Sequence, residues 1–258
     1  MIVIAAMLVA LWGASVATAQ TIASLKIISG DGQVVCLCKS STLQFFQPIT
    51  VQALDASGHG VANAAITWTV TSGQATLGSS NNNTNTTTTD SNGMSTSPLN
   101  QTVLAIYGTL VQPYLASTIV AAANSGNPSA TFYETYSLID QNGNPMVGAG
   151  VPTVNGQLLG TTVLSGNSGS TLPNIQLFAG GKGLAADGVQ NVSIQLVPYP
   201  GQTSPTITCD PSSSTGNPGA VLSDSSGNAN CTPRLSGSGT GQFYVMVGGG
   251  ATDRKSVV

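Results

Sequence analysis

The sequence predicts an all-β protein made of two β-sandwiches in tandem, the second of which lacks its last strand. Charged residues are only 6% of the 258-residue chain, and glutamate occurs once. Soluble proteins average roughly 25% charged residues. Strong helix formers other than Ala and Leu are therefore scarce, whereas β-branched and turn residues abound. Short segments also alternate apolar and polar residues between turn signals, as strands with one buried face do.

The first sandwich is predicted over residues 20–138. Residues 49–53 and 66–70 alternate in polarity and are separated by the Gly-rich turn DASGHG. The run NNNTNTTTT at 81–89 is expected to be a solvated loop, with a glycan acceptor or a contact surface as alternatives. A hairpin built from residues 119–123 and 131–138 is expected to close the sandwich.

The second sandwich is predicted over residues 161–252, because segments of the first half recur there in the same order. TVLSGNSGS resembles KIISGDGQ, and AVLSDSSGNANCTPRL follows the same plan as TTTTDSNGMSTSPL. Likewise GQFYVMVGGG resembles STIVAAANSG. Residues 139–160, rich in Gly, Asn and Pro, are expected to form a linker between the two units.

The motif V-x-A-x-D-x-x-G-x-G-V-x-x-A-x-I-T-W, followed by TTDSNGM and IVAAANSGNPSATF, resembles bacterial Ig-like repeats of the invasin/intimin type. The resemblance covers most of residues 23–138 and, more loosely, 161–252. It implies two tandem Ig-like sandwiches that form a rigid extracellular module of a surface adhesin or a secreted protein. The second copy departs from the pattern, with FAGGKGLAADGV at the first turn and Gln-Leu in place of Thr-Trp.

Residues 1–19 are predicted to be a secretory signal peptide. An apolar run ends in Ala17-Thr18-Ala19, which predicts cleavage between Ala19 and Gln20. The segment before the apolar run has no Lys or Arg, and an uncleaved membrane anchor is the alternative. We therefore expect an exported protein, either secreted or on the bacterial cell surface.

No constellation of catalytic residues is evident, so we expect no enzyme activity, no cofactor and no metal. His59 is the only histidine and lies in a turn, which leaves no Ser-His-Asp triad without it. Four aspartates precede glycine by two or three residues, where the carboxylate accepts turn amides: Asp55, Asp90, Asp140 and Asp224. The net charge of −3 with six cations offers no basic patch for nucleic acid.

Four cysteines in an exported chain indicate disulfides. Cys209 ends one predicted strand and Cys231 begins another, so we expect these two to pair. Cys36 and Cys38 leave the same face of an extended segment, with Cα atoms near the roughly 7 Å limit for a disulfide. A local bridge would require a bend; free thiols or partners in another chain are the alternatives.

The last six residues, 253–258, break the composition of the chain with Asp-Arg-Lys. They can be back-translated into the start of a common sequencing adapter, and they stand where the repeat calls for a final strand. We interpret them as adapter read-through, with further domains of the same chain expected beyond Thr252.

The expected function is a non-catalytic exported Ig-like module that serves as an adhesin stalk or structural spacer. Its partner would be an extracellular protein or glycan that the sequence does not name. The alternative is an accessory module, for example a carbohydrate-binding one, of a larger secreted enzyme.

Overall fold

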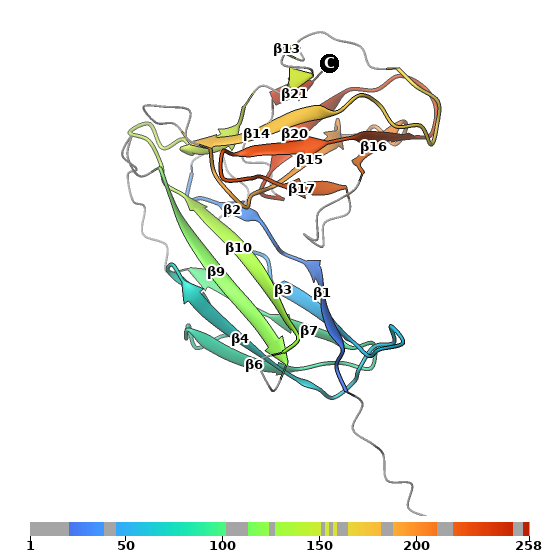
Figure 1. Ribbon diagram of the computed structural model, residues 1–258. Coiled ribbons are helices and arrows are strands. Elements are labelled where there is room, and N and C mark those ends of the chain that lie inside the picture. Colours follow the sequence, from blue (N-terminus) through green and yellow to red (C-terminus); the bar gives the residue numbers. More distant parts are fainter. Residues whose placement is uncertain are drawn as a thin grey trace, which may run out of the picture.

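The computed structural model describes residues 21–38, 45–101, 113–123, 127–150, 153–154, 157–158, 165–181, 188–210, 219–249 and 255–257. Every regular element within these ranges is a β-strand. Figure 1 shows two strand-built units, with the second lying over the end of the first near β2 (Gln33–Val35). The protein is therefore all-β, as the sequence predicts. The described residues include no helix long and apolar enough to cross a membrane.

The first unit is a sandwich of two main sheets. One sheet has the strand order β1–β3–β7 and the other β2–β10–β9–β4–β6, and all pairings are antiparallel except β2 with β10. A short pair, β5–β8, lies beside them. The remaining strand bounds are β1 Ser24–Ser29, β3 Ile49–Leu54, β4 Ala65–Ser72, β5 Ala75–Leu77, β6 Thr84–Thr88, β7 Met94–Ser97, β8 Leu99–Gln101, β9 Tyr114–Ala123 and β10 Ser129–Ser137.

The second unit repeats this plan. One sheet joins β11–β14–β12–β13, with β18 also paired to β14, and the other has the order β17–β15–β20–β21. A two-stranded pair, β16–β19, completes the unit. The strand bounds are β11 Val147–Ala149, β12 Thr153–Val154, β13 Gln157–Leu158, β14 Ile175–Gly181, β15 Ser193–Pro198, β16 Thr206–Cys209, β17 Ala220–Leu222, β18 Asn228–Cys231, β19 Pro233–Ser236, β20 Phe243–Val247 and β21 Lys255–Val257.

Each unit has its own hydrophobic core, formed by the inward residues of its alternating strands. In the first unit Trp68 is fully buried and its ring centroid lies 5.8 Å from that of Phe132. The indole Nε1 donates to Thr87 Oγ1 over 2.8 Å, so the buried N–H is satisfied. In the second unit the core includes Leu177 and Ile194, which are also fully buried.

The two units share local detail as well as strand order. The Ala53 amide donates to Gly93 O over 2.8 Å, and the Ala179 amide donates to Gly227 O over the same distance. In each unit the glycine belongs to an Asp-x-x-Gly turn that packs against an earlier glycine. The internal repeat predicted from the sequence is thus visible as repeated backbone geometry.

A side-chain bridge is repeated too. Thr89 Oγ1 donates to Val61 O over 2.7 Å, and Ser223 Oγ donates to Val189 O over 2.6 Å. Both hydroxyls stand just before the aspartate of their turn. The second unit therefore repeats the local hydrogen bonding of the first at equivalent positions.

The prediction that residues 139–160 form a linker is wrong in part, because this segment contributes strands to the second unit. β11 pairs with β14 through Val147, and β12 also pairs with β14. Leu138 and Met146 are buried in the first core, whereas Val147 and Ala149 are buried in the second. Glycine and asparagine in this segment form a turn between two buried strands, which composition alone does not distinguish from a linker.

The polar run at 81–89 is also different from the expected loop. Thr84–Thr88 forms β6, which pairs antiparallel with β4 along the edge of the larger sheet. Asn85 Nδ2 donates to Ser97 Oγ over 2.9 Å, so one face of this polar strand meets other polar groups, while the alternate threonines are exposed. Threonine is β-branched and favours strands even where no apolar alternation marks them.

The second sandwich was expected to lack its last strand, yet Lys255–Val257 forms β21 antiparallel to β20. β20 pairs with β15 as β9 pairs with β4, so β21 occupies the place of β10. Main-chain hydrogen bonds do not depend on side-chain identity, which lets a charged segment occupy this position. The adapter origin of 253–258 stays a prediction. The signal peptide at 1–19 and the cleavage site at Ala19 and Gln20 lie outside the described residues.

Candidate functional site

The four turn aspartates adopt one geometry. In each, Oδ1 accepts the backbone N–H groups two and four residues later at 2.8–3.0 Å, in the turns of Asp55, Asp90, Asp140 and Asp224. His59 is exposed, and its Nδ1 lies 3.7 Å from Asp55 Oδ2. These carboxylates organise turns and lie in separate loops rather than in one site.

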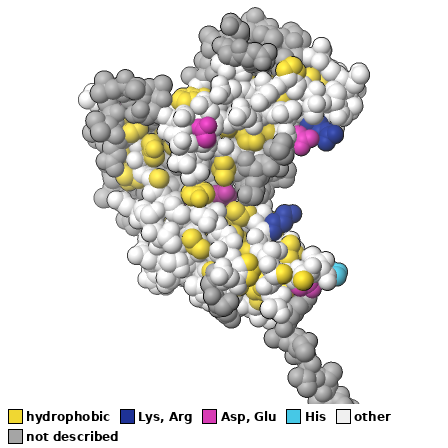
Figure 2. All heavy atoms as spheres, in the orientation of Figure 1, with side chains coloured by type: hydrophobic (Ala, Val, Ile, Leu, Met, Phe, Trp, Pro, Cys, Tyr) yellow, Lys and Arg dark blue, Asp and Glu magenta, His cyan; other side chains and the backbone are white. Residues whose placement is uncertain are grey.

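No group of three or more His, Cys, Asp or Glu side chains that could hold a metal ion occurs among the described residues. Charged side chains are sparse on the face in Figure 2, where the surface is mostly neutral. One exposed ion pair joins Arg234 Nη1 to Asp210 Oδ2 over 3.3 Å.

Both disulfides are formed. Cys209 and Cys231, 22 residues apart, join the β16–β19 pair to β18 within the second core. Cys36 and Cys38 bridge locally just after β2, with Cα atoms 5.3 Å apart. The chain ends its extended run at Val35, and the resulting bend brings the two Cα atoms within bridging range.

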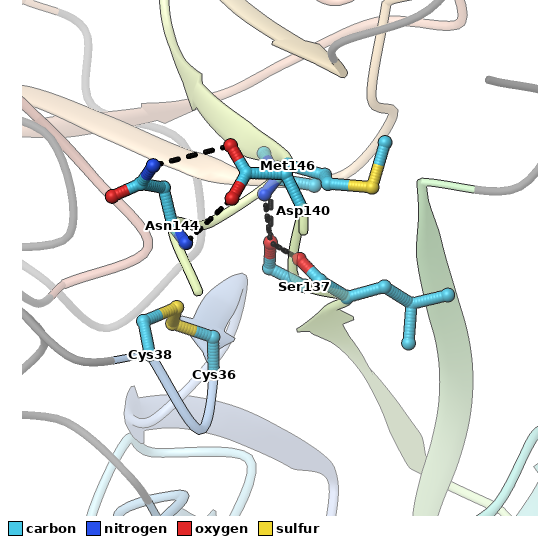
Figure 3. Close-up of a disulfide and its surroundings, with 8 residues drawn as sticks. Cys36, Cys38, Ser137, Asp140, Asn144 and Met146 are labelled. Carbon is cyan, nitrogen blue, oxygen red and sulfur yellow. Dashed lines mark hydrogen bonds between the residues drawn. A yellow bond between two sulfur atoms is a disulfide. The ribbon is translucent and has the colours of Figure 1, made fainter. Parts of the chain in front are cut away.

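Figure 3 shows the Cys36–Cys38 bridge beside the segment that passes from one unit to the other. Ser137 Oγ accepts the amides of Met146 and Val147 over 3.1 and 2.9 Å. Asp140 closes the intervening turn by accepting the Asn144 amide over 2.9 Å. The chain passes from one unit to the other between Met146 and Val147, which are buried in the first and the second core respectively. The disulfide, the turn and Ser137 lie at this point and fix its geometry.

The candidate functional site is the junction of the two sandwiches, where a continuous main-chain ladder passes between them. Gly32 N donates to Tyr133 O over 2.8 Å, and Gly32 O accepts from Ser193 N over 2.9 Å. Ser193 O accepts from Gly248 N over 2.7 Å, and Gly248 O accepts from Val34 N over 3.2 Å. β2 and the Gly32 that precedes it are therefore hydrogen-bonded to both units.

Glycine is required at this ladder because the two backbones approach so closely. Gly32 has φ of 76°, and a Cβ there would lie 2.5 Å from Ser193 N. Gly248 has φ of 73°, and its Cβ would lie 2.3 Å from Val34 N. Any side chain at either position would force the units apart.

Beside the ladder, the first unit buries a cluster of polar side chains. Asp31, Gln33 and Glu134 are 1%, 5% and 1% exposed. Asp31 Oδ1 accepts the Tyr133 amide over 2.8 Å. Gln33 Nε2 donates to Gly30 O over 2.8 Å and to Glu134 Oε1 over 3.5 Å. Glu134 Oε2 has no hydrogen-bond partner among the described residues.

Burial changes the acidity of both carboxyls. It raises the pKa of Asp31 from 3.8 to about 7, although the amides of Tyr133 and Gly32 stabilise the carboxylate. Burial, and then the charge of Asp31, raise the pKa of Glu134 well above its ordinary value. In both cases desolvation outweighs the hydrogen bonds that favour the charged form.

Sequence reasoning did not single out this cluster. One signal was available: Phe132, Glu134 and Tyr136 alternate along one strand, which places the only glutamate on the buried face. The predicted site residues are spread over other turns and the two disulfides.

Comparison with known proteins finds no matching family model and no matching characterised sequence. Similar solved structures include invasin, a bacterial integrin-binding protein, at 14% identity and a TM-score of 0.30, over 91% of this chain and 38% of that one. Domains 4–9 of the surface layer protein SbsC match at 10% identity and 0.28, over 92% and 31%. The D00-D0 domain of intimin matches at 16% identity and 0.22, over 90% and 94%.

Invasin and intimin, the two proteins named by the sequence resemblance, are thus both among the similar structures. This chain spans well under half the length of the invasin and surface-layer structures. The class that the strand pairing defines is a tandem pair of Ig-like β-sandwiches.

Proposed function

We propose that the protein is a non-catalytic exported module that acts as a rigid spacer or stalk in a surface or secreted protein. The observation that carries the proposal is the shared strand β2. It hydrogen-bonds to the second unit through Val34 and the adjoining Gly32, and it pairs with β10 of the first unit. A spacer needs its domains to hold a fixed angle, and main-chain bonds across a junction restrict hinge motion.

The same ladder distinguishes this junction from a flexible linker. A linker rich in Gly and Asn would let the two sandwiches reorient freely. Here the chain instead crosses between the units at Met146–Val147, where both amides bond to Ser137 Oγ. The spacer proposal therefore rests on two separate points of attachment.

The test is whether the two units tumble as one body in solution, measured by NMR relaxation of backbone amides in each unit. We expect a single correlation time for the wild-type protein. Gly32→Ala should uncouple the units, because its Cβ would meet Ser193 N. Gly58→Ala is the matched control: Gly58 also has positive φ, but no atom of the described residues lies within 4 Å of its Cβ position.

Independent tumbling of the two wild-type units would contradict the spacer role. Export is tested separately, by asking whether an antibody against the folded protein labels intact producing cells. No specific observation favours the alternative of a carbohydrate-binding accessory module. In the part of the chain that the structure describes, the exposed large apolar side chains are Phe45 and Tyr199, one in each unit.

A further inference from the structure

The buried carboxyls Asp31 and Glu134 are connected to the junction through their chain neighbours. Asp31 precedes Gly32, whose carbonyl accepts the Ser193 amide of the second unit. Glu134 follows Tyr133, whose carbonyl accepts the Gly32 amide. A change in charge or hydration at either carboxyl therefore acts directly on the hydrogen bonds that join the sandwiches.

No positive charge from the described part of the chain acts on the pair. Among the described residues, β2 contributes Gln33, which bonds to Glu134, and β15 contributes Ser193, whose amide bonds to Gly32; the other titratable residues of β10 are Tyr133 and Tyr136. Lys26 on β1 is exposed. Two ionised carboxylates in this pocket would repel each other without compensation, and an uncompensated buried charge is strongly unfavourable.

A proton would remove one of the two charges, and Glu134 Oε2, to which no described group donates, is the oxygen available to carry it. The other oxygen, Glu134 Oε1, accepts from Gln33 Nε2, and Asp31 is the negative charge that acts on this carboxyl. A cation would neutralise the pair as well. However, it would need several oxygen ligands, and the described chain brings no third carboxylate to this place.

We propose that Asp31 and Glu134 retain protons in the folded protein and act as an acid-strengthened clasp, so that the junction tightens in acid and loosens as the pair ionises. The clasp is a property of this junction beyond the proposed spacer role, and it holds whether or not the protein is a stalk. The expected transition lies between the ordinary pKa of Asp31, 3.8, and its folded value of about 7.

The first experiment reads the proton on Glu134 directly. Glu134 is the only glutamate in the chain, so glutamate labelled with ¹³C at the carboxyl carbon gives one carboxyl resonance. The signal missing from Glu134→Gln identifies it. We expect the protonated chemical shift at about pH 6. An ionised shift at that pH, or a titration at the ordinary value of 4.5, would overturn the proposal. So would an ionised signal that appears only when Ca²⁺ or Mg²⁺ is added.

The second experiment follows the junction itself by hydrogen exchange of the Ser193 amide, corrected for intrinsic rates. Protection should fall between about pH 4 and about pH 7, by up to about tenfold per pH unit for each carboxyl that loses its proton when the junction opens. The Ala179 amide, which bonds to Gly227 inside the second unit, should not change. Asp31→Asn should weaken the pH dependence, because only Glu134 then retains a proton, whereas Asp90→Asn, in an exposed turn, should leave it intact.

Wild-type protection that does not vary with pH would overturn the clasp, as would an undiminished pH dependence in Asp31→Asn. If Asp31→Asn fails to fold, the wild-type exchange profile and the Glu134 resonance still decide the matter. Neither of those two measurements needs a substitution at Asp31.

Discussion

Val34 and Val35 are neighbours in the chain, yet they are buried in different hydrophobic cores. Val34 packs in the core of the second sandwich and Val35 in that of the first, and both are 0% exposed. Side chains alternate along a strand, so one strand lying between two sandwiches can serve both. The units are therefore joined by apolar packing as well as by main-chain bonds.

The first prediction follows from this division. Val34→Ala should destabilise the second unit by about 1–3 kcal/mol, although Val34 lies at the start of the first. Val35→Ala is the matched control and should act mainly on the first unit. Trp68 fluorescence during urea unfolding reports on the first unit, and exchange of the Val189 amide reports on the second. Equal effects of both substitutions on Trp68 would argue against separate cores.

The second prediction concerns pH. A carboxyl whose pKa is raised by folding binds its proton more tightly in the folded state, so it stabilises that state at low pH. For Asp31 this stabilisation is complete below 3.8 and is lost as the pH rises to about 7. The urea midpoint of the Trp68 transition should accordingly rise as the pH falls from about 7 to about 4. A midpoint that falls over this range would show that the carboxylates are ionised in the folded state.

Much of the fold could be predicted from local pattern. The strands at 49–53 and 66–70 and the Asp-x-x-Gly turns have short-range causes, namely alternation and turn amides. The polar strand β6 could not be predicted, because its inward partners Ser95 and Ser97 come from another sheet. Likewise nothing local distinguishes Val34 from Val35.

The buried polar cluster of Asp31, Gln33 and Glu134 could not be predicted from local pattern for a related reason. Asp31 lies in a Gly-rich turn, where an aspartate is ordinarily a turn residue. Its partner in the structure, the Tyr133 amide, is 102 positions away. Only the parallel pairing of β2 with β10 brings Gln33 opposite Glu134. Long-range pairing of this kind depends on the whole sandwich and not on any one segment.

The third prediction separates the two disulfides. In the chain-entropy account, cross-linking stabilises more when it closes a longer loop. The Cys209–Cys231 bridge spans 22 positions and should contribute roughly 3 kcal/mol. The Cys36–Cys38 bridge spans 2 and should contribute about 1.5 kcal/mol. Thermal unfolding of the two paired Cys→Ser variants checks the order, and a larger loss for the Cys36–Cys38 pair would contradict it.

The fourth prediction tests the repeated glycine contact. Gly227 has φ of 78°, and a Cβ there would lie 2.3 Å from Ala179 O and 2.4 Å from Gly188 Cα. Backbone in this region costs a non-glycine residue about 1–2 kcal/mol, and the clash with fixed backbone atoms adds to it. Gly201→Ala is the matched control, since Gly201 shares the positive φ but has no neighbour from the described part of the chain within 4 Å of its Cβ position.

Chemical denaturation of the two variants should therefore show a larger loss for Gly227→Ala than for Gly201→Ala. Gly93→Ala in the first unit should behave like Gly227→Ala, because its Cβ would lie 2.5 Å from Ala53 O. Equal losses at Gly201 and Gly227 would mean that φ alone sets the cost. The close approach of the two turns would then contribute nothing to the stability of either sandwich.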